Sequence, residues 1–545
     1  MSHRLKHQWI LWNTLPSFAY QCFAVLVSLV FFSDVGVGIV RANEANGSTA
    51  VQMAQQSDDA SIEPNRAAAE QVFTEGVQLY QQGTAESLQQ AIPKFEQAAI
   101  LYRQVDDKSL EALSLLALGK IYFDLGEKQK TLELFNQALP ILRAVGDKSG
   151  EARTLSHLGS IYNSLGEKQK ALEFFNQALP ILRAVGDKSE EARTLSHLGS
   201  IYNSLGEKQK ALEFLNQALP LYKAVGDKSG EATILNNLGR VYDSLGERQK
   251  ALEFLNQALP LYKTVGDKSG EAVTLNNLGL VYDSLGEKQK ALEFFNQALP
   301  LRRAVGDKSG EATTLSNIGR VYNDLGEKQK ALEFYNQALP LFQAVGDRGG
   351  EATTLSNIGA FYDSLGEKQK ALEFFNQALP ILRAVGDRGV GALTLNSLAN
   401  VYNDLGEKQK ALEFFNQALP LLRAVGDRGG EAVTLTNIGS VYNSLGEKHK
   451  ALELYNQALP LTRAVGNRGG EAITLNNIGL VYDSLGEKQK ALEFYNQALP
   501  LLRAVGDRGV EAITLHNIGL VYDSLGEKQK ALEFYNQALP LLRAV

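Results

Sequence analysis

The sequence predicts an all-α fold, a solenoid of about twelve antiparallel helix pairs. Three observations predict it. A forty-residue unit recurs along the chain, and its Gly-Glu step returns every forty residues from Gly126 to Gly526. Within each unit, apolar residues recur at the three- and four-residue steps of a helix face. Glycine separates the two helical stretches of each unit, and repetition with this period indicates a solenoid whose units pack only against their neighbours.

The first 42 residues resemble an export signal or an N-terminal anchor. A basic start with Arg4 and Lys6 precedes the largely apolar run 18–32, and Val40-Arg41-Ala42 fits a small-residue cleavage site. We therefore expect the repeats to be exported to the periplasm or the cell exterior, with membrane anchoring by residues 18–40 as the alternative. Cys22, the only cysteine, lies in this segment, so no disulfide is expected among the repeats.

Between this segment and the strict repeats, we expect two further regions. Residues 43–65 are rich in Ala, Ser, Gln and Asn without an apolar period, which predicts a disordered spacer. Residues 66–107 keep the second-helix spacing but have a longer connecting turn, and are expected to form a divergent first helix pair. Eleven regular repeats follow over 108–545.

The copy at 151–189 shows how each regular unit is expected to fold. Leu155, Leu158, Ile161, Tyr162 and Leu165 share one face of a first helix. This helix is expected to end at Gly166, which favours the left-handed conformation.

The second helix of that unit is expected to start at Glu167 and to turn Ala171, Phe175 and Ala178 inward. Asp187 or Ser189 is then available to cap the next helix. Eleven of the chain's fourteen prolines fall at one position of this second helix, which predicts a recurrent kink.

Together, Leu155-x2-Leu158-Gly159-x2-Tyr162 and Ala171-x3-Phe175-x2-Ala178 resemble the tetratricopeptide repeat over about residues 66–545. The unit is forty residues rather than thirty-four, so it resembles the extended type found in kinesin light chains. The resemblance implies a right-handed superhelical α-solenoid whose first helices line a concave groove. Phrases such as GEKQKALEFYNQALPL also look like cyanobacterial repeat proteins, many of which continue into a CHAT protease domain.

The resemblance implies that one position of the first helix faces the groove. In most repeats this position holds asparagine, and we call this column of side chains the amide ladder. Asparagine offers donors and an acceptor that can hold a peptide backbone regardless of its side chains. These predicted peptide-binding residues are Asn237, Asn277, Asn317, Asn357, Asn437, Asn477 and Asn517. Three residues after each ladder position the side chains vary, as recognition of a partner's side chains requires; we call this the variable position. The predicted readout residues there are Arg240, Leu280, Arg320, Asn400, Leu480 and Leu520. The alternative is that copying made the asparagines uniform, since residues 151–189 and 191–229 differ at only four positions.

The sequence gives little indication of nucleic-acid binding, metal binding or catalysis. The formal net charge of −6 argues against binding nucleic acid, which needs a basic surface. His157 and His197 occupy equivalent repeat positions, which duplication explains better than metal binding, and no metal, cofactor or catalytic residue is expected.

These observations favour a non-enzymatic scaffold that binds an extended peptide or a partner's segment in its groove. Two alternatives remain: a solenoid that self-associates end to end, and a regulatory arm for a separately encoded CHAT-type protease.

Overall fold

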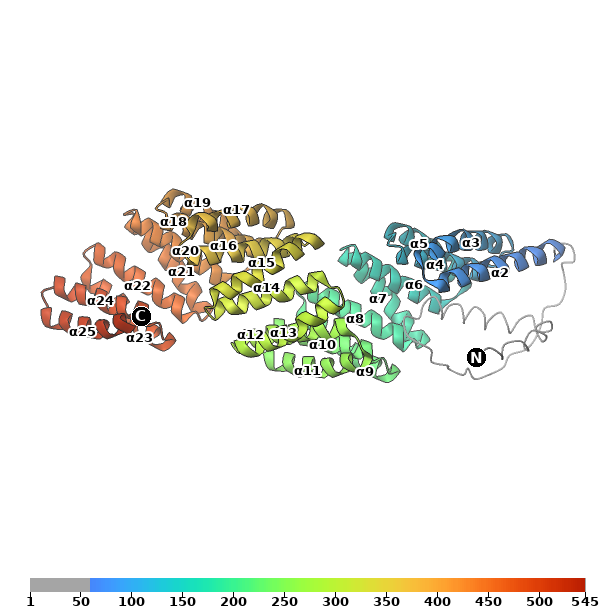
Figure 1. Ribbon diagram of the computed structural model, residues 1–545, viewed down its shortest axis with the longest axis horizontal. Helices are drawn as coiled ribbons and strands as arrows, with labels where there is room; N and C mark the ends of the chain where they lie inside the picture. Colours follow the sequence, from blue (N-terminus) through green and yellow to red (C-terminus); the bar gives the residue numbers. More distant parts are fainter. Residues whose placement is uncertain (1–58, 545) are drawn as a thin grey trace. The chain divides into compact units, whose positions relative to one another are not determined.

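The structure, a computed structural model, describes residues 59–544 and divides the chain into two units that meet at Asp267 and Lys268. The expected export segment and residues 43–58 of the expected spacer lie outside the described residues. In the described part of the chain every regular element is an α-helix, and within each unit the helices stack as antiparallel pairs (Figure 1).

The two units contain helices of similar length. The first unit comprises α2 (Asp59–Gln82), α3 (Ala85–Gln104), α4 (Lys108–Asp124), α5 (Lys128–Val145), α6 (Lys148–Ser164), α7 (Lys168–Val185), α8 (Lys188–Ser204), α9 (Lys208–Val225), α10 (Lys228–Ser244) and α11 (Arg248–Val265). The second comprises α12 (Lys268–Ser284), α13 (Lys288–Ala304), α14 (Lys308–Asp324), α15 (Lys328–Val345), α16 (Arg348–Ser364), α17 (Lys368–Val385), α18 (Arg388–Asp404), α19 (Lys408–Val425), α20 (Arg428–Ser444), α21 (Lys448–Ala464), α22 (Arg468–Ser484), α23 (Lys488–Val505), α24 (Arg508–Ser524) and α25 (Lys528–Ala544). Because α2 begins at Asp59, residues 59–65, expected to belong to the spacer, are helical.

The even-numbered helices are the first helices of the pairs, and α6 shows why they form where they do. The Asp147 side chain accepts a hydrogen bond from the Gly150 backbone N–H at 2.8 Å, which satisfies a donor that the helix itself leaves unpaired. Leu155 and Leu158 are fully buried, and Gly166 follows the helix at φ +81°. The equivalent cap expected from Asp187 is present on α8. Caps and turns therefore follow the sequence pattern.

The odd-numbered helices are the second helices, and they begin and end differently. At the start of α7, Glu167 makes no capping hydrogen bond and instead pairs with Lys170 at 2.5 Å. At its end, Gly186 takes the left-handed conformation at φ +74°, which suits a residue without a Cβ. The helix continues past Pro180 to Val185, so the proline does not terminate it.

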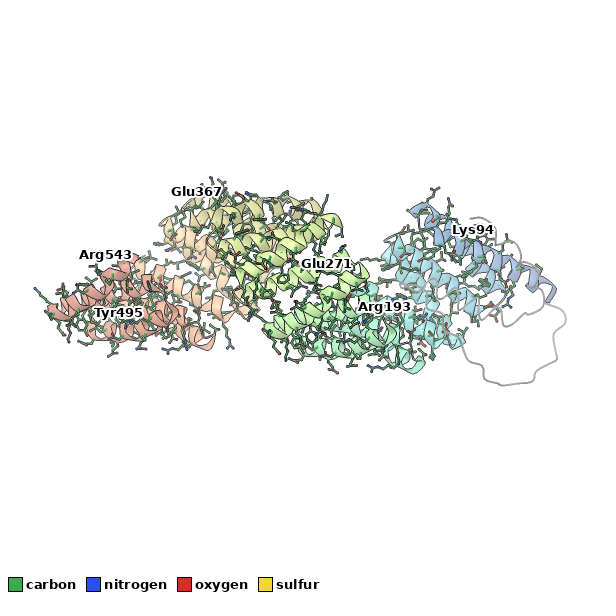
Figure 2. The ribbon with its side chains drawn as sticks, turned by 60° about the horizontal axis from the view of Figure 1, so that its bottom comes forward. Lys94, Arg193, Glu271, Glu367, Tyr495 and Arg543 are labelled. Carbon is green, nitrogen blue, oxygen red and sulfur yellow. The ribbon has the colours of Figure 1, made fainter. Side chains whose placement is uncertain are left out.

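Each pair is held together by close approach at a small residue. In the α6–α7 pair, a Cβ added to Gly159 would lie 3.0 Å from the Phe175 ring, which is fully buried. Beside it, Tyr162 stacks on Phe174 with ring centroids 5.3 Å apart. Leu165, expected on the buried face, is 44% exposed because it lies beyond the last helical turn. The same glycine–aromatic contact recurs in the second unit, where the Gly479 partner is Tyr495, labelled in Figure 2.

Among the described residues, no helix combines the length and apolar character that a membrane span requires.

Candidate functional site

Consecutive even-numbered helices are joined by hydrogen bonds between buried polar side chains, which we call bridges. The bridges show which sides of an even helix are occupied by its neighbours. On α20, Thr434 reaches back to the preceding even helix, where its hydroxyl accepts a hydrogen bond from the Asn396 side-chain amide at 2.8 Å. Two residues later, the Thr436 hydroxyl lies 3.2 Å from that of Thr474 on the following even helix. Equivalent bridges are Ser156–Thr194, Asn276–Thr314, Ser356–Thr394 and Asn476–Thr514. Both flanks of an even helix are therefore occupied by its neighbours.

The remaining two sides of an even helix differ in burial. Leu435 and Ile438 of α20 are buried in the core that the even and odd helices share. On the opposite side, Val433, Asn437 and Ser440 lie at i, i+4 and i+7, and all three retain solvent exposure. The layer of even helices therefore presents a partly exposed face, which we call the inner face; at its edge the Ser440 hydroxyl lies 3.1 Å from that of Tyr455 on α21.

The predicted amide ladder lies on this inner face, and each of its seven asparagines is half-buried. Asn237 belongs to α10 in the first unit, and the other six belong to the second unit. Half-burial holds the amides in defined positions while part of each side chain still meets solvent.

Two ladder asparagines are hydrogen-bonded to the variable position of the preceding repeat. The Asn437 amide donates to the Asn400 side-chain oxygen at 3.3 Å, and the Asn477 amide donates to the Ser440 hydroxyl at 3.5 Å. The structure thus brings the predicted ladder and readout columns into contact. This contact was not expected from the sequence, because it joins residues of different repeats.

Where the preceding variable residue is apolar, the ladder amide has a different environment. Asn317 follows Leu280 and donates instead to the side-chain oxygen of Asn276 at 3.2 Å. Asn517 follows Leu480, and within the described residues its buried amide nitrogen has no hydrogen-bond partner. An unsatisfied buried donor costs about 1–3 kcal/mol.

The predicted readout residues differ in accessibility. Arg240, Asn400 and Leu520 are exposed, whereas Leu280, Arg320 and Leu480 are half-buried. Arg320 forms an ion pair with the buried carboxylate of Asp283 on the preceding even helix, so an acidic partner would compete with that carboxylate.

In α8 of the first unit a histidine takes the ladder position. His197 stacks on Phe175 with ring centroids 5.2 Å apart, and it lies one turn after Arg193, labelled in Figure 2. Burial, with a smaller contribution from the Arg193 charge, lowers the pKa of His197 to about 4. His197 is therefore neutral at physiological pH.

Sequence reasoning missed a further column on the inner face, four residues before the ladder. In α18, α20, α22 and α24 this column is aliphatic: Leu393, Val433, Ile473 and Ile513 are 55%, 46%, 39% and 50% exposed. The helical pattern hid it, because an aliphatic residue beside a core stripe is easily assigned to the core. The sequence does carry one sign of this column: its residue type changes from arginine in earlier repeats, at Arg153 and Arg193, to aliphatic residues in these four helices.

Within residues 59–544, no three His, Cys, Asp or Glu side chains gather as metal ligands would. In α8, α12, α16, α18, α20 and α22 an Asn or Asp near the end of the helix instead bonds the lysine that opens the next helix, as between Asp363 and Lys368 at 2.7 Å. That hydrogen bond and a second one to Asp404 raise the pKa of Lys368.

Comparison with protein families identifies the repeat. A model described as Tetratricopeptide repeat matches residues 129–184, 150–224, 190–264, 306–384, 392–464, 432–504 and 471–544, which together cover more than half of the chain. A second model with the same description matches residues 272–308. No curated protein matches the chain. The matched models describe a repeat that generally serves as a non-catalytic scaffold for protein interactions.

Solved structures that match the chain do so at low sequence identity and with TM-scores below 0.5. The quorum sensor NprR from B. thuringiensis, in its apo form, is 18% identical with a TM-score of 0.48, over 66% of this chain and 99% of that one. Aspartyl phosphate phosphatase F from Bacillus subtilis is 16% identical with a TM-score of 0.45, over 68% and 96%. A STAND-class signal transduction ATPase with a tetratricopeptide repeat sensor, from Pyrococcus horikoshii, is 17% identical with a TM-score of 0.47. That match covers 64% of this chain and 55% of the archaeal protein, about half of its length.

Proposed function

We propose that this chain, which belongs to the tetratricopeptide repeat family, is a non-enzymatic scaffold that binds an extended peptide or partner segment along the inner face of its even-numbered helices. The observation that carries the proposal is the column of half-buried amides in α12, α14, α16, α20, α22 and α24. Its members recur at one helical position, so a segment that crosses the helices meets an amide in nearly every repeat.

The chemistry of this column suits a peptide backbone. An asparagine amide supplies two N–H donors and one carbonyl acceptor, which match the carbonyl and N–H groups of an extended chain. The recognition is independent of the partner's side chains, and selectivity comes from the neighbouring columns. The buried bridges to either side favour this role because they fix the helices that carry the amides.

The proposal is tested by replacing three amides of the second unit. Asn317, Asn357 and Asn437 are changed together to alanine in the full chain, and partner capture from cells that make the protein is compared with wild type. The matched control removes three exposed asparagines from odd helices, and these substitutions are Asn336→Ala, Asn376→Ala and Asn416→Ala.

We expect the inner-face variant to lose partner capture while its far-ultraviolet circular dichroism stays that of wild type. The odd-helix control should capture the partner normally. If a folded inner-face variant still captures the partner, the proposal fails, and repeat duplication explains the uniform asparagines.

Export of the repeats is the second part of the proposal, and it rests on the N-terminal sequence alone. Arg4 and Lys6 precede the apolar run 18–32, as in secretory signals. Cell fractionation with N-terminal sequencing of the mature protein tests it. Recovery outside the cytoplasm is expected, and a purely cytoplasmic protein that retains Met1 would refute it.

A further inference from the structure

The aliphatic column missed in the sequence forms a continuous stripe across four even helices. Leu393, Val433, Ile473 and Ile513 occupy the same helical position in α18, α20, α22 and α24. Exposed Leu520 extends the apolar surface at its C-terminal end. We call the four-residue set the aliphatic stripe. Single exposed aliphatic residues are ordinary, but a row of them on consecutive helices indicates a binding surface.

The stripe runs directly beside the amide column. Val433, Ile473 and Ile513 each lie four positions before a ladder asparagine, and Leu393 lies four positions before Ser397, so stripe and polar column share one face of each helix. A segment lying on this face would therefore contact an apolar side chain and a polar one in each repeat.

No charge interrupts this part of the inner face. In α18, α20, α22 and α24 the stripe, ladder and variable positions hold only Leu, Val, Ile, Asn and Ser. The contrast lies within the chain, since Arg153 and Arg193 occupy the stripe position in α6 and α8 of the first unit. A charged partner residue placed on the stripe would lose hydration without gaining a counter-ion. The face therefore selects an uncharged segment.

The spacing of the helices sets the periodicity of the partner. Packed helices lie about 8–10 Å apart. A polyproline II segment has three residues per turn and rises about 3.1 Å per residue, so every third side chain points the same way at intervals of about 9 Å. A β-strand would turn every third side chain to the opposite face. The polyproline II conformation therefore matches this spacing, with one partner side chain for each stripe residue in turn.

We propose that the aliphatic stripe binds an uncharged segment in the polyproline II conformation that carries an aliphatic residue at every third position. This inference rests on the proposed function and names its partner class. The ladder holds the backbone of the segment, and the stripe reads its side chains.

The probe is a fluorescein-labelled fifteen-residue peptide of five Leu-Pro-Ser repeats, blocked at its C-terminus and titrated with the full chain in fluorescence anisotropy. A control peptide has the same composition with its five leucines in one block. The test variant changes all four stripe residues to threonine (Leu393→Thr, Val433→Thr, Ile473→Thr and Ile513→Thr). Threonine occupies this position in α14 and α16, as Thr313 and Thr353, so the repeat accepts it.

We expect the periodic peptide to bind wild type at least about tenfold more tightly than it binds the four-threonine variant, given the apolar area that each stripe residue would bury. The reverse change, Thr313→Leu with Thr353→Val, lengthens the stripe from four helices to seven, because Val273 already occupies this position in α12, and should tighten binding. Absence of binding to wild type, equal binding to the four-threonine variant, or equal binding of the block peptide would each overturn the inference.

Two outcomes separate this inference from the proposed function and from self-association. If the triple asparagine variant loses the natural partner while the four-threonine variant keeps it, the scaffold function stands and the stripe proposal fails. If light scattering shows that wild type self-associates and the four-threonine variant does not, the stripe is a contact between copies, and the peptide proposal also fails.

Discussion

Removing one buried hydroxyl at the bridge between α18 and α20 should lower the stability of both helices against local unfolding. Thr434 is fully buried, and its hydroxyl accepts a hydrogen bond from Asn396 at 2.8 Å and donates one to the Gly430 carbonyl at 2.8 Å. The substitution Thr434→Val keeps the shape of the side chain and removes both hydrogen bonds. The Asn396 amide, itself buried, then lacks this partner.

The expected cost follows from that orphaned amide. A buried polar group left unpaired costs about 1–3 kcal/mol. Native-state hydrogen exchange, measured on peptides from α18 and α20, reports this as a loss of protection of about 5- to 150-fold. Exchange is preferable to a single melting curve, because each repeat is stabilised mainly by its neighbours and the array need not unfold as one unit.

A double substitution isolates the pair. Asn396→Ala with Thr434→Val removes both partners, and it should cost less than the sum of the two single changes by about 0.5–3 kcal/mol. Thr313→Val is the matched control, because Thr313 is exposed and bonds only within its own helix. The bridge is not a stabilising contact if Thr434→Val keeps the wild-type protection from hydrogen exchange. The same conclusion follows if the stability losses of the two single variants add strictly in the double variant.

Three further predictions concern single residues. His197, with its pKa lowered to about 4, should stay neutral in NMR titrations down to that pH. Since the unfolded chain then binds more protons, this residue should lower stability as pH falls from about 6.5 to 4. Gly479→Ala places a methyl group 2.6 Å from the Tyr495 ring, and overpacking should cost about 1–3 kcal/mol in chemical denaturation. Asp427→Ala removes the side-chain cap of α20 and should cost about 1 kcal/mol by the same measurement.

Each of these predictions has a control in the chain. His197→Gln should remove the contribution of this residue to the pH dependence of stability, and an unchanged pH profile would count against the buried neutral imidazole. In Gly469→Ala on α22 the added methyl group meets only the Asn467 side-chain oxygen, at 3.8 Å, and should not destabilise, so equal losses at Gly469 and Gly479 would argue against the ring contact. Asp427→Asn should be nearly neutral, because Asn467 caps α22 in the native chain.

Much of the helical architecture was predictable from the sequence because its signals are local. The Leu155–Leu158 spacing, the left-handed Gly166 and the Asp187 cap are properties of one repeat, and the structure confirms all three. Leu165, expected on the same helical face as Leu155 and Leu158, is 44% exposed, because helical periodicity does not show where the last turn ends.

The inner face was less predictable because it depends on contacts between repeats. The ladder residue Asn437 and its neighbour Thr436 are both polar, and only the position of the next helix shows that Thr436 forms a bridge while Asn437 stays on the open side. The pairing of Arg320 with Asp283 likewise spans two repeats. Periodicity within one unit carries no information on such contacts.

Site-specific photo-crosslinking tests most directly whether the inner face of the even helices is the recognition surface. A benzophenone amino acid replaces Thr313 or Val433 on the inner face, or Gln337 or Gln497 on the exposed side of odd helices. The crosslink is then formed in cells that make the protein. Partner adducts at 313 and 433, and none at 337 and 497, are the predicted result. Adducts confined to the odd-helix positions would contradict the account.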